Sequence, residues 1–190
     1  DGQFTDREAN LLDAILLIHA DHGGGNNSTF TNVVVGSTGT DLYSALSASI
    51  GSLKGPKHGG ANISVSRMMD QIIEETGYTE DRDKVRAIVN RILDRDFYDR
   101  SGLVYGFGHA VYTISDPRAE LLRALCQRLA GEKDCMYKFT FYKLFEDTVK
   151  EVVLERKGHV IPSNVDLYSG LAYNMLGIPE ELYTPLFATA

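Results

Sequence analysis

Apolar residues recur three and four positions apart along most of this chain, and clusters of glycine separate several of these stretches. That spacing matches the 3.6-residue period of a helix with one buried face. It predicts helices over residues 9–20, 61–76, 83–98, 117–129, 138–157 and 164–176. Capping residues indicate two more helices, one over 27–35 capped by Asn27 or Ser28 and one over 40–50 started by Thr40 or Asp41. Only residues 102–114, where three glycines stand between apolar residues, indicate an irregular turn or short strand. The sequence therefore predicts an all-α protein of about eight or nine helices.

Composition excludes several kinds of function. The 190 residues are 43% hydrophobic and 24% charged, enough for one or two compact units with real cores. A net charge of −7 and the absence of a Lys/Arg block argue against nucleic acid or an anionic membrane surface as a partner. No apolar run reaches the roughly 20 residues of a spanning helix. Cys126 and Cys135 show neither metal-ligand spacing nor a disulfide pattern, so we expect a cytoplasmic protein, of bacterial type.

His58 lies in a glycine-rich segment just before a predicted helix that begins near Ala61. The positive potential of a helix N-terminus disfavours imidazolium. A neutral imidazole there can donate a hydrogen bond to a carbonyl group that is gaining negative charge. The alternative is a tight turn in which the histidine has no role.

His109 and Arg118 are nine residues apart, across a glycine turn and a helix start at Asp116-Pro117. A guanidinium in a first helical turn, beside unpaired backbone N–H groups, is suited to binding a carboxylate. Both side chains could therefore face one anion. The alternative is a weak surface ion pair such as Arg118 with Glu120.

Asp166 falls inside the first turn of another predicted helix, where the helix dipole alone favours an acid. To act as a general base it would need burial next to an acidic C–H group. His19 and His22 could share a helical face, but no third ligand follows at metal-binding spacing, so we expect no metal. These residues together suggest carbonyl or carboxylate chemistry without naming a reaction.

Four stretches of the sequence closely resemble the citrate synthase family. They occur in the family's order and cover about half the chain: HADHGGGNNSTF (19–30), GSTGTDLYSALSASIGSLKGPKHGGAN (36–62), GFGHAVYTISDPRA (106–119) and NVDLYSGLAYNMLGIPEELYTPLFA (164–188). The resemblance implies an all-helical, two-domain fold that closes on its substrate. It also implies the condensation of acetyl-CoA with oxaloacetate to give citrate and CoA.

The resemblance assigns roles to particular residues. Asp166 would abstract a proton from the methyl group of acetyl-CoA, and His58 would hydrogen-bond the thioester carbonyl and hold the resulting enol. His109 and Arg118 would bind oxaloacetate and polarise its ketone, which the enol attacks. His22 would also bind oxaloacetate. Hydrolysis of citryl-CoA would complete the reaction.

Further residues would support the site. Ser28 would orient His58, with Asn26 nearby. The turn before His109 would contact the CoA adenine through backbone groups: Leu103, Val104, Tyr105, Gly106, Phe107 and Gly108. The resemblance implies no permanently bound cofactor, since the coenzyme A thioester enters as a substrate. Thr113 stands where some family members have a CoA-binding arginine.

The resemblance also implies a domain division and an assembly. Residues 1–61 would form a large-domain segment, 62–177 the complete small domain, and 178–190 a return to the large domain, with hinges near Gly59-Gly60 and Leu176-Gly177. A homodimer is expected. The family's N-terminal helices and its C-terminal arginine-bearing helices do not match any part of the sequence. The chain is therefore expected to be an internal piece that is poorly active alone.

Three alternatives remain open from the sequence. The first is 2-methylcitrate synthase, which uses propionyl-CoA, although the GGGNNST form of the first motif favours citrate synthase. The second is the related domain of ATP-citrate lyase, which would need nucleotide-handling domains. The third is a non-catalytic helical fragment.

Overall fold

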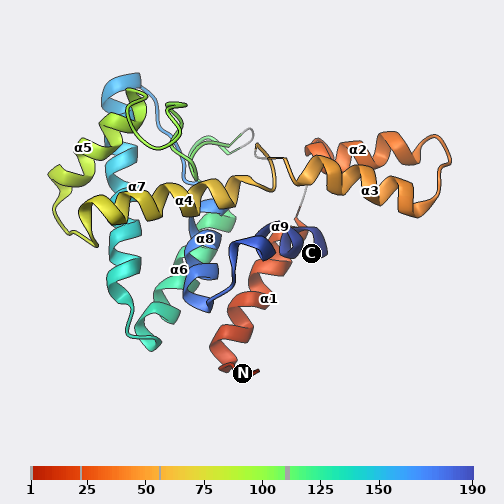
Figure 1. The fold of residues 1–190 in the computed structure, drawn as a ribbon, viewed down its shortest axis with the longest axis horizontal. Coiled ribbons are helices and arrows are strands. Elements are labelled where there is room, and N and C mark those ends of the chain that lie inside the picture. Colours follow the sequence, from red (N-terminus) through yellow and green to blue (C-terminus); the bar gives the residue numbers. More distant parts are fainter. Residues whose placement is uncertain (1, 22, 56, 110–111) are drawn as a thin grey trace.

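The computed structural model describes residues 2–21, 23–55, 57–109 and 112–190. Within them the predicted all-α class is confirmed: the regular structure consists of nine α-helices and one 3₁₀ turn (Figure 1). The helices are α1 (Asp6–Ala20), α2 (Asn27–Gly36), α3 (Leu42–Leu53), α4 (Ala61–Thr76), α5 (Arg82–Leu93), α6 (Pro117–Glu132), α7 (Met136–Lys157), α8 (Val165–Leu176) and α9 (Tyr183–Thr189), with the 3₁₀ turn η1 (Glu180–Leu182) before α9.

Helix α8 lies at the centre of the core. Its sequence, VDLYSGLAYNML, carries a single charged residue, Asp166, and is apolar or small nearly all round, which is typical of a buried helix. Accordingly α8 packs against α6 and α4, while α5 packs on α7 (Figure 1). The first turn of α8 therefore starts inside the core, where Val165 and Leu167 are buried.

Two other parts of the fold adjoin this core. Helix α1 packs on α6, α8 and α9, so the N-terminal and C-terminal segments of the chain lie together. Helices α2 and α3 form a hairpin that projects away from the other helices (Figure 1). Several large apolar side chains of this hairpin are exposed: Phe30, Val33, Val34, Leu42, Tyr43, Leu46 and Ile50.

Most helix starts follow the capping residues predicted from the sequence. The side chains of Asp41, Asp116 and Asn164 each accept a hydrogen bond from a backbone N–H group of the helix that follows. The cap of α2 was predicted wrongly, as Asn27 or Ser28. It is Asn26, whose side chain makes no capping hydrogen bond, so the helix simply begins one residue earlier.

The prediction for the helix over 83–98 was wrong at its end, because α5 stops at Leu93. The chain then adopts left-handed backbone conformations at Arg95, Tyr98 and Arg100, with φ of 63°, 55° and 57°. Phe97 lies within the predicted helix but beyond the end of α5. It is still buried, at 5% exposure, because the turn directs it back into the core.

The segment 102–114 is irregular, as predicted, and its described residues are fastened to the chain just before α8. Phe107 forms an isolated antiparallel bridge with Ser163. The N–H group of Gly108 donates to the carbonyl of Pro162 at 2.8 Å, and the N–H group of Asn164 donates to the carbonyl of Gly106 at 2.9 Å. This pairing brings the loop that carries His109 alongside the start of α8.

Candidate active site

His58 lies in a tight turn between α3 and α4. A side chain at Gly59 would place its Cβ 2.6 Å from the carbonyl oxygen of Leu53, so only glycine fits this path. Helix α4 begins at Ala61, whose N–H group donates to the carbonyl of His58. His58 is therefore held at the positive end of α4, as the sequence indicates.

Ser28, from α2, makes two contacts with the imidazole of His58. The Nε2 atom lies 2.9 Å from Ser28 Oγ and accepts from the Ser28 N–H group at 3.3 Å. A backbone N–H group can only donate, so Nε2 carries no proton and a neutral ring has its proton on Nδ1. Asn26 lines the same surface pocket as His58, and its buried Oδ1 has no hydrogen-bond partner among the described residues.

Arg118 is held by Asp116 rather than by Glu120. The guanidinium Nε and Nη2 atoms each lie 3.0 Å from one of the two Asp116 carboxylate oxygens, a bidentate pair. Asp116 is only 1% exposed, and Glu120 pairs instead with Arg123. A buried partner fixes the orientation of the guanidinium far better than a surface ion pair would.

His109 contacts Arg118 directly. Its Nε2 lies 3.1 Å from Arg118 Nη2, and its Nδ1 lies 3.1 Å from the backbone nitrogen of Tyr112. Both of these partners are donors, whereas a neutral imidazole accepts at one nitrogen only. Burial, together with the charge of Arg118, lowers the pKa of His109. The result is a neutral ring beside a fixed cation. The ring nitrogen that carries the proton needs an acceptor, and a carbonyl or carboxylate oxygen of a ligand could take that place.

Asn164 holds Asp166 and the His109 loop together. Its Oδ1 accepts from the Asp166 N–H group at 3.0 Å, and its Nδ2 donates to the carbonyl of Gly108 at 3.1 Å. Burial raises the pKa of Asp166 to about 6; the charge of Asp116 adds to this effect and that of Arg118 opposes it. A carboxylate with such a pKa is suited to accept a proton near neutral pH.

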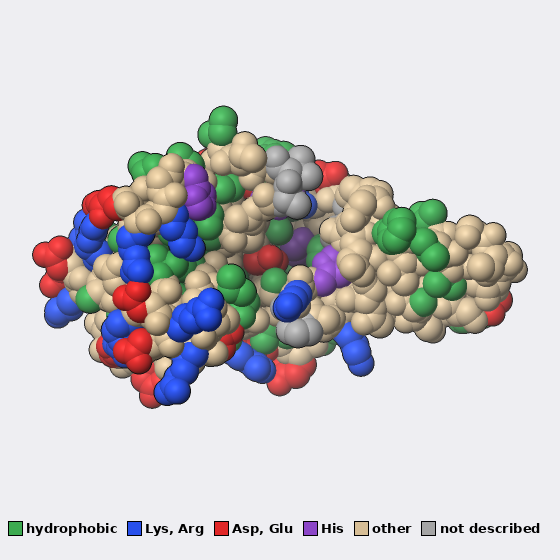
Figure 2. All heavy atoms as spheres, turned by 90° about the horizontal axis from the view of Figure 1, so that it is seen from above, with side chains coloured by type: hydrophobic (Ala, Val, Ile, Leu, Met, Phe, Trp, Pro, Cys, Tyr) green, Lys and Arg blue, Asp and Glu red, His purple; other side chains and the backbone are tan. Residues whose placement is uncertain are grey.

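Asp166 borders a small enclosed space that is also lined by Gly59, the neighbour of His58, and by Tyr173. Figure 2 shows an acidic side chain and histidine side chains in the hollow between the main body and the α2–α3 hairpin. Arg118, which contacts His109, acts electrostatically on Asp166, and Asp166 shares its small enclosed space with Gly59, the neighbour of His58. His22, the remaining predicted site residue, lies outside the described residues.

The predicted CoA-contacting turn is partly committed to internal contacts. Val104 is buried and Leu103 is exposed, while the hydroxyl of Tyr105 donates to Asp99 at 2.5 Å. Phe107 meets Phe145 edge to face. The carbonyls of Gly106 and Gly108 already accept from Asn164, and the Gly108 N–H group already donates to Pro162.

Sequence reasoning missed the tertiary roles of Asp116 and Asn164. Both were recognised as helix starts, but the same side chains also hold Arg118 and the His109 loop. It also did not foresee that His19, 6% exposed, lies 3.1 Å from the hydroxyl of Tyr173. No sequence pattern indicates these partners, which lie up to 154 residues away.

The part of the chain that the structure describes lacks two features. Among them, no group of three or more His, Cys, Asp or Glu side chains is arranged to hold a metal ion. No helix within the described ranges is long and apolar enough to cross a bilayer.

Comparisons with known proteins agree with the geometry. The family model described as citrate synthase, C-terminal domain, matches residues 1–190. A citrate synthase of Deinococcus radiodurans is 40% identical over 187 residues, which are 98% of this chain and 45% of that protein. A 2-methylcitrate synthase 2 of Corynebacterium glutamicum is 37% identical over 175 residues, 92% of this chain and 41% of that protein. The chain thus spans less than half the length of these relatives.

A solved structure shows the same fold. The citrate synthase of the archaeon Thermoplasma acidophilum, in a ternary complex with carboxymethyl coenzyme A and oxaloacetate, has a TM-score of 0.77 and 30% sequence identity. The match covers 98% of this chain and 46% of that one. Because the family model covers every residue, this chain belongs to the citrate synthase family.

Proposed function

We propose that the protein carrying this chain condenses acetyl-CoA with oxaloacetate to form citrate and CoA. The observation that carries the proposal is Asp166, whose pKa of about 6 and position beside the His58 turn suit a base that removes a weakly acidic C–H proton. The ligands of the Thermoplasma acidophilum structure, an acyl-CoA analogue and oxaloacetate, support the same substrates here.

In the proposed first step, Asp166 takes a proton from the methyl group of the thioester. His58, whose proton is on Nδ1, donates a hydrogen bond to the thioester oxygen as negative charge develops there. A neutral donor stabilises the enolate form of this intermediate through the hydrogen bond alone, without a full proton transfer. Ser28 sets this tautomer, so its role is to orient rather than to react.

In the proposed second step, the enol carbon attacks the ketone of oxaloacetate. Arg118, fixed by Asp116, would bind a substrate carboxylate, and His109 would donate to the ketone oxygen. His22 would add a further contact. Citryl-CoA would then be hydrolysed to citrate and free CoA.

We propose that coenzyme A binds as a substrate along residues 103–108, with no permanently bound cofactor. Because backbone groups of Gly106 and Gly108 are already bonded to 162–164, and the Leu103 N–H group already donates to Ser101, the adenine would use the carbonyl of Leu103 and the backbone groups of Val104 and Tyr105 instead. The exposure of Leu103 favours this arrangement.

We also propose the domain division at residues 61 and 177. Helix α9 packs against α1 and α3, both within 1–61, which supports the return of 178–190 to that unit. Gly177 ends α8 with φ of 69°, and Gly59 tolerates no side chain, so both proposed hinges lie at glycines that shape the backbone. The cytoplasmic location remains a prediction from the unpaired Cys126 and Cys135.

A homodimer is proposed on the strength of the α2–α3 hairpin. Its exposed apolar side chains, such as Val33 and Leu42, form the kind of surface that a second copy would cover. Sedimentation of the protein should show a dimer that Val33→Glu dissociates. An unchanged dimer in that variant would place the interface elsewhere.

The test of the function is release of free CoA thiol by the natural full-length protein from oxaloacetate and acetyl-CoA, with Asp166→Ala as control. Activity that the control abolishes would support the proposal, and turnover by the control would refute the role of Asp166. The second candidate, favoured by the Corynebacterium glutamicum relative, is 2-methylcitrate synthesis. A higher kcat/KM for propionyl-CoA than for acetyl-CoA would select it.

A further inference from the structure

Glu146 is a fully buried acid that the proposed reaction does not use. It lies in the middle of α7 and is 0% exposed, flanked along the helix by the buried residues Phe145 and Val149. Burying a carboxylate in such a core is strongly unfavourable unless it is paired and hydrogen-bonded. Its partners therefore indicate what the residue does.

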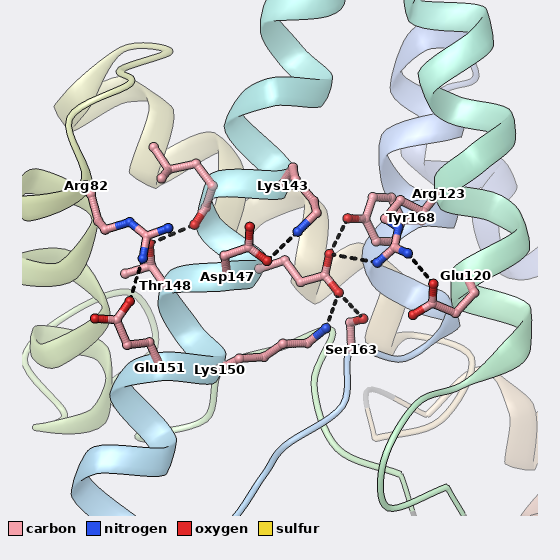
Figure 3. Close-up of polar contacts among 12 residues, drawn as sticks. Arg82, Glu120, Arg123, Lys143, Asp147, Thr148, Lys150, Glu151, Ser163 and Tyr168 are labelled. Atoms are coloured by element: carbon pink, nitrogen blue, oxygen red, sulfur yellow. Dashed lines mark hydrogen bonds and ion pairs between the residues drawn. The ribbon is translucent and has the colours of Figure 1, made fainter.

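Four groups converge on this carboxylate from three helices and a loop. Oε1 accepts from Ser163 Oγ at 2.7 Å and from Lys150 Nζ at 2.5 Å. Oε2 accepts from the Tyr168 hydroxyl at 2.5 Å and lies 3.7 Å from Arg123 Nη1. Figure 3 shows Ser163, Lys150, Tyr168 and Arg123 directed toward one point between α6, α7 and α8.

The charges around Glu146 keep it ionised. Burial alone would raise its pKa, but hydrogen bonds from Lys150, Tyr168 and Ser163 outweigh burial and hold the pKa at about 2. Arg123 is in turn paired with Glu120. The carboxylate therefore stays negatively charged at neutral pH.

Two of these partners flank Asp166 in the sequence. Ser163 comes three residues before it and Tyr168 two residues after it. Residues two apart on a helix point to different sides, so Tyr168 faces Glu146 while Asp166 borders the small enclosed space that Gly59 also lines. Ser163 is also the residue that pairs with Phe107, next to Gly108 and His109.

We propose that Glu146 is a positioning residue, which fixes both the first turn of α8 with Asp166 and the His109 loop that Ser163 joins to it. It touches no reacting atom in the proposed mechanism. The inference rests on the proposed function only for its kinetic consequence, because the anchoring of the backbone is independent of the reaction.

The test uses Glu146→Gln and Tyr168→Phe in the natural full-length protein, with Glu151→Gln as matched control. Glu151 is also on α7 and pairs with Arg82 and Arg86, but these partners belong to α5 and lie apart from α8. We expect Glu146→Gln to lower kcat by about tenfold or more, with a smaller change in KM for either substrate. Tyr168→Phe should cause a smaller fall in the same direction, and the control should stay within about twofold of wild type.

A second measurement, hydrogen exchange resolved over 104–109 and 162–168, does not depend on turnover. Exchange there should accelerate in Glu146→Gln and not in Glu151→Gln, with exchange in α1 unchanged. Normal kcat together with unchanged exchange in Glu146→Gln would overturn the proposal. If Glu146→Gln does not fold, Tyr168→Phe decides by the same two criteria. If the wild type condenses neither acyl-CoA, the proposed function fails, while the exchange data still test the anchoring.

Discussion

Replacing Asp166 by asparagine should stabilise the fold, and increasingly so as the pH rises. The folded-state pKa of about 6 lies above the ordinary value of 3.8, so the folded chain holds this proton more tightly than the unfolded chain does. The stability that the proton provides is fully present below pH 3.8 and is lost as the pH rises through 6. Asparagine has nearly the same shape and carries no charge, so the variant avoids this loss.

The size of the effect follows from the pKa difference. A difference of 6 against 3.8 corresponds to about 3 kcal/mol when the carboxylate is fully ionised. About two-thirds of it develops between pH 4.5 and pH 7.5. Asp166 is partly exposed, so water reduces the value. We expect the advantage of Asp166→Asn over wild type to grow by about 1–2 kcal/mol across that range.

Urea unfolding of the 190-residue chain, followed by far-ultraviolet circular dichroism at the two pH values, measures this growth. Asp13→Asn, the same chemical change at an exposed position of α1, is the control and should show little pH-dependent difference. An advantage that is equal at both pH values would show that Asp166 is not a desolvated carboxyl, and the argument for it as the base would lose its physical ground.

Three further outcomes are expected. Because Asp166 must be ionised to act as a base, kcat of the full-length protein should rise with pH through an apparent pKa near 6. The value of kcat at pH 5 should be about one-tenth of the plateau, and a flat profile would contradict this. Ser28→Ala should lower kcat by up to about tenfold, the worth of the Oγ hydrogen bond that orients the His58 ring, while the backbone N–H group that sets the tautomer remains and the unfolding free energy changes little; undiminished kcat would show that the Ser28 hydroxyl does not contribute to the site. Gly106→Ala should destabilise the chain by about 1–3 kcal/mol in urea unfolding, since φ is 86° and the new Cβ would lie 3.1 Å from Leu167 Cβ; a neutral change would mean that the loop can shift away from α8.

The helices could be predicted because their signals are local. Periodicity and capping depend on residues only a few positions apart. Helices accordingly begin at Asp41, Asp116 and Asn164, whose side chains can cap them. The end of α5 could not be predicted in this way. Its apolar face continues to Phe97, and only the tertiary packing shows that the chain reaches that burial through a left-handed turn.

The candidate site could be predicted from the sequence only in part. The motifs indicated His58, His109, Arg118 and Asp166 as site residues. The side chains that hold two of these regions in place, Asp116 and Asn164, could not be assigned that role from the sequence. Glu146 is the clearest case, since an acid among apolar residues of a long helix looks like an ordinary surface residue until its partners are known. Contacts between residues distant in sequence have no local signature.

The bridge between Phe107 and Ser163 also determines when the site can form during folding. It closes a loop of 56 residues that contains the whole of α6 and α7, and loop closure of that length costs roughly 3–4 kcal/mol of chain entropy. Such a contact becomes favourable only after the helices inside the loop have packed and brought its ends together. The His109 loop and Asp166 should therefore become neighbours late, after most of the core has formed. A chain emerging from the ribosome would form a helical core before it forms an active site.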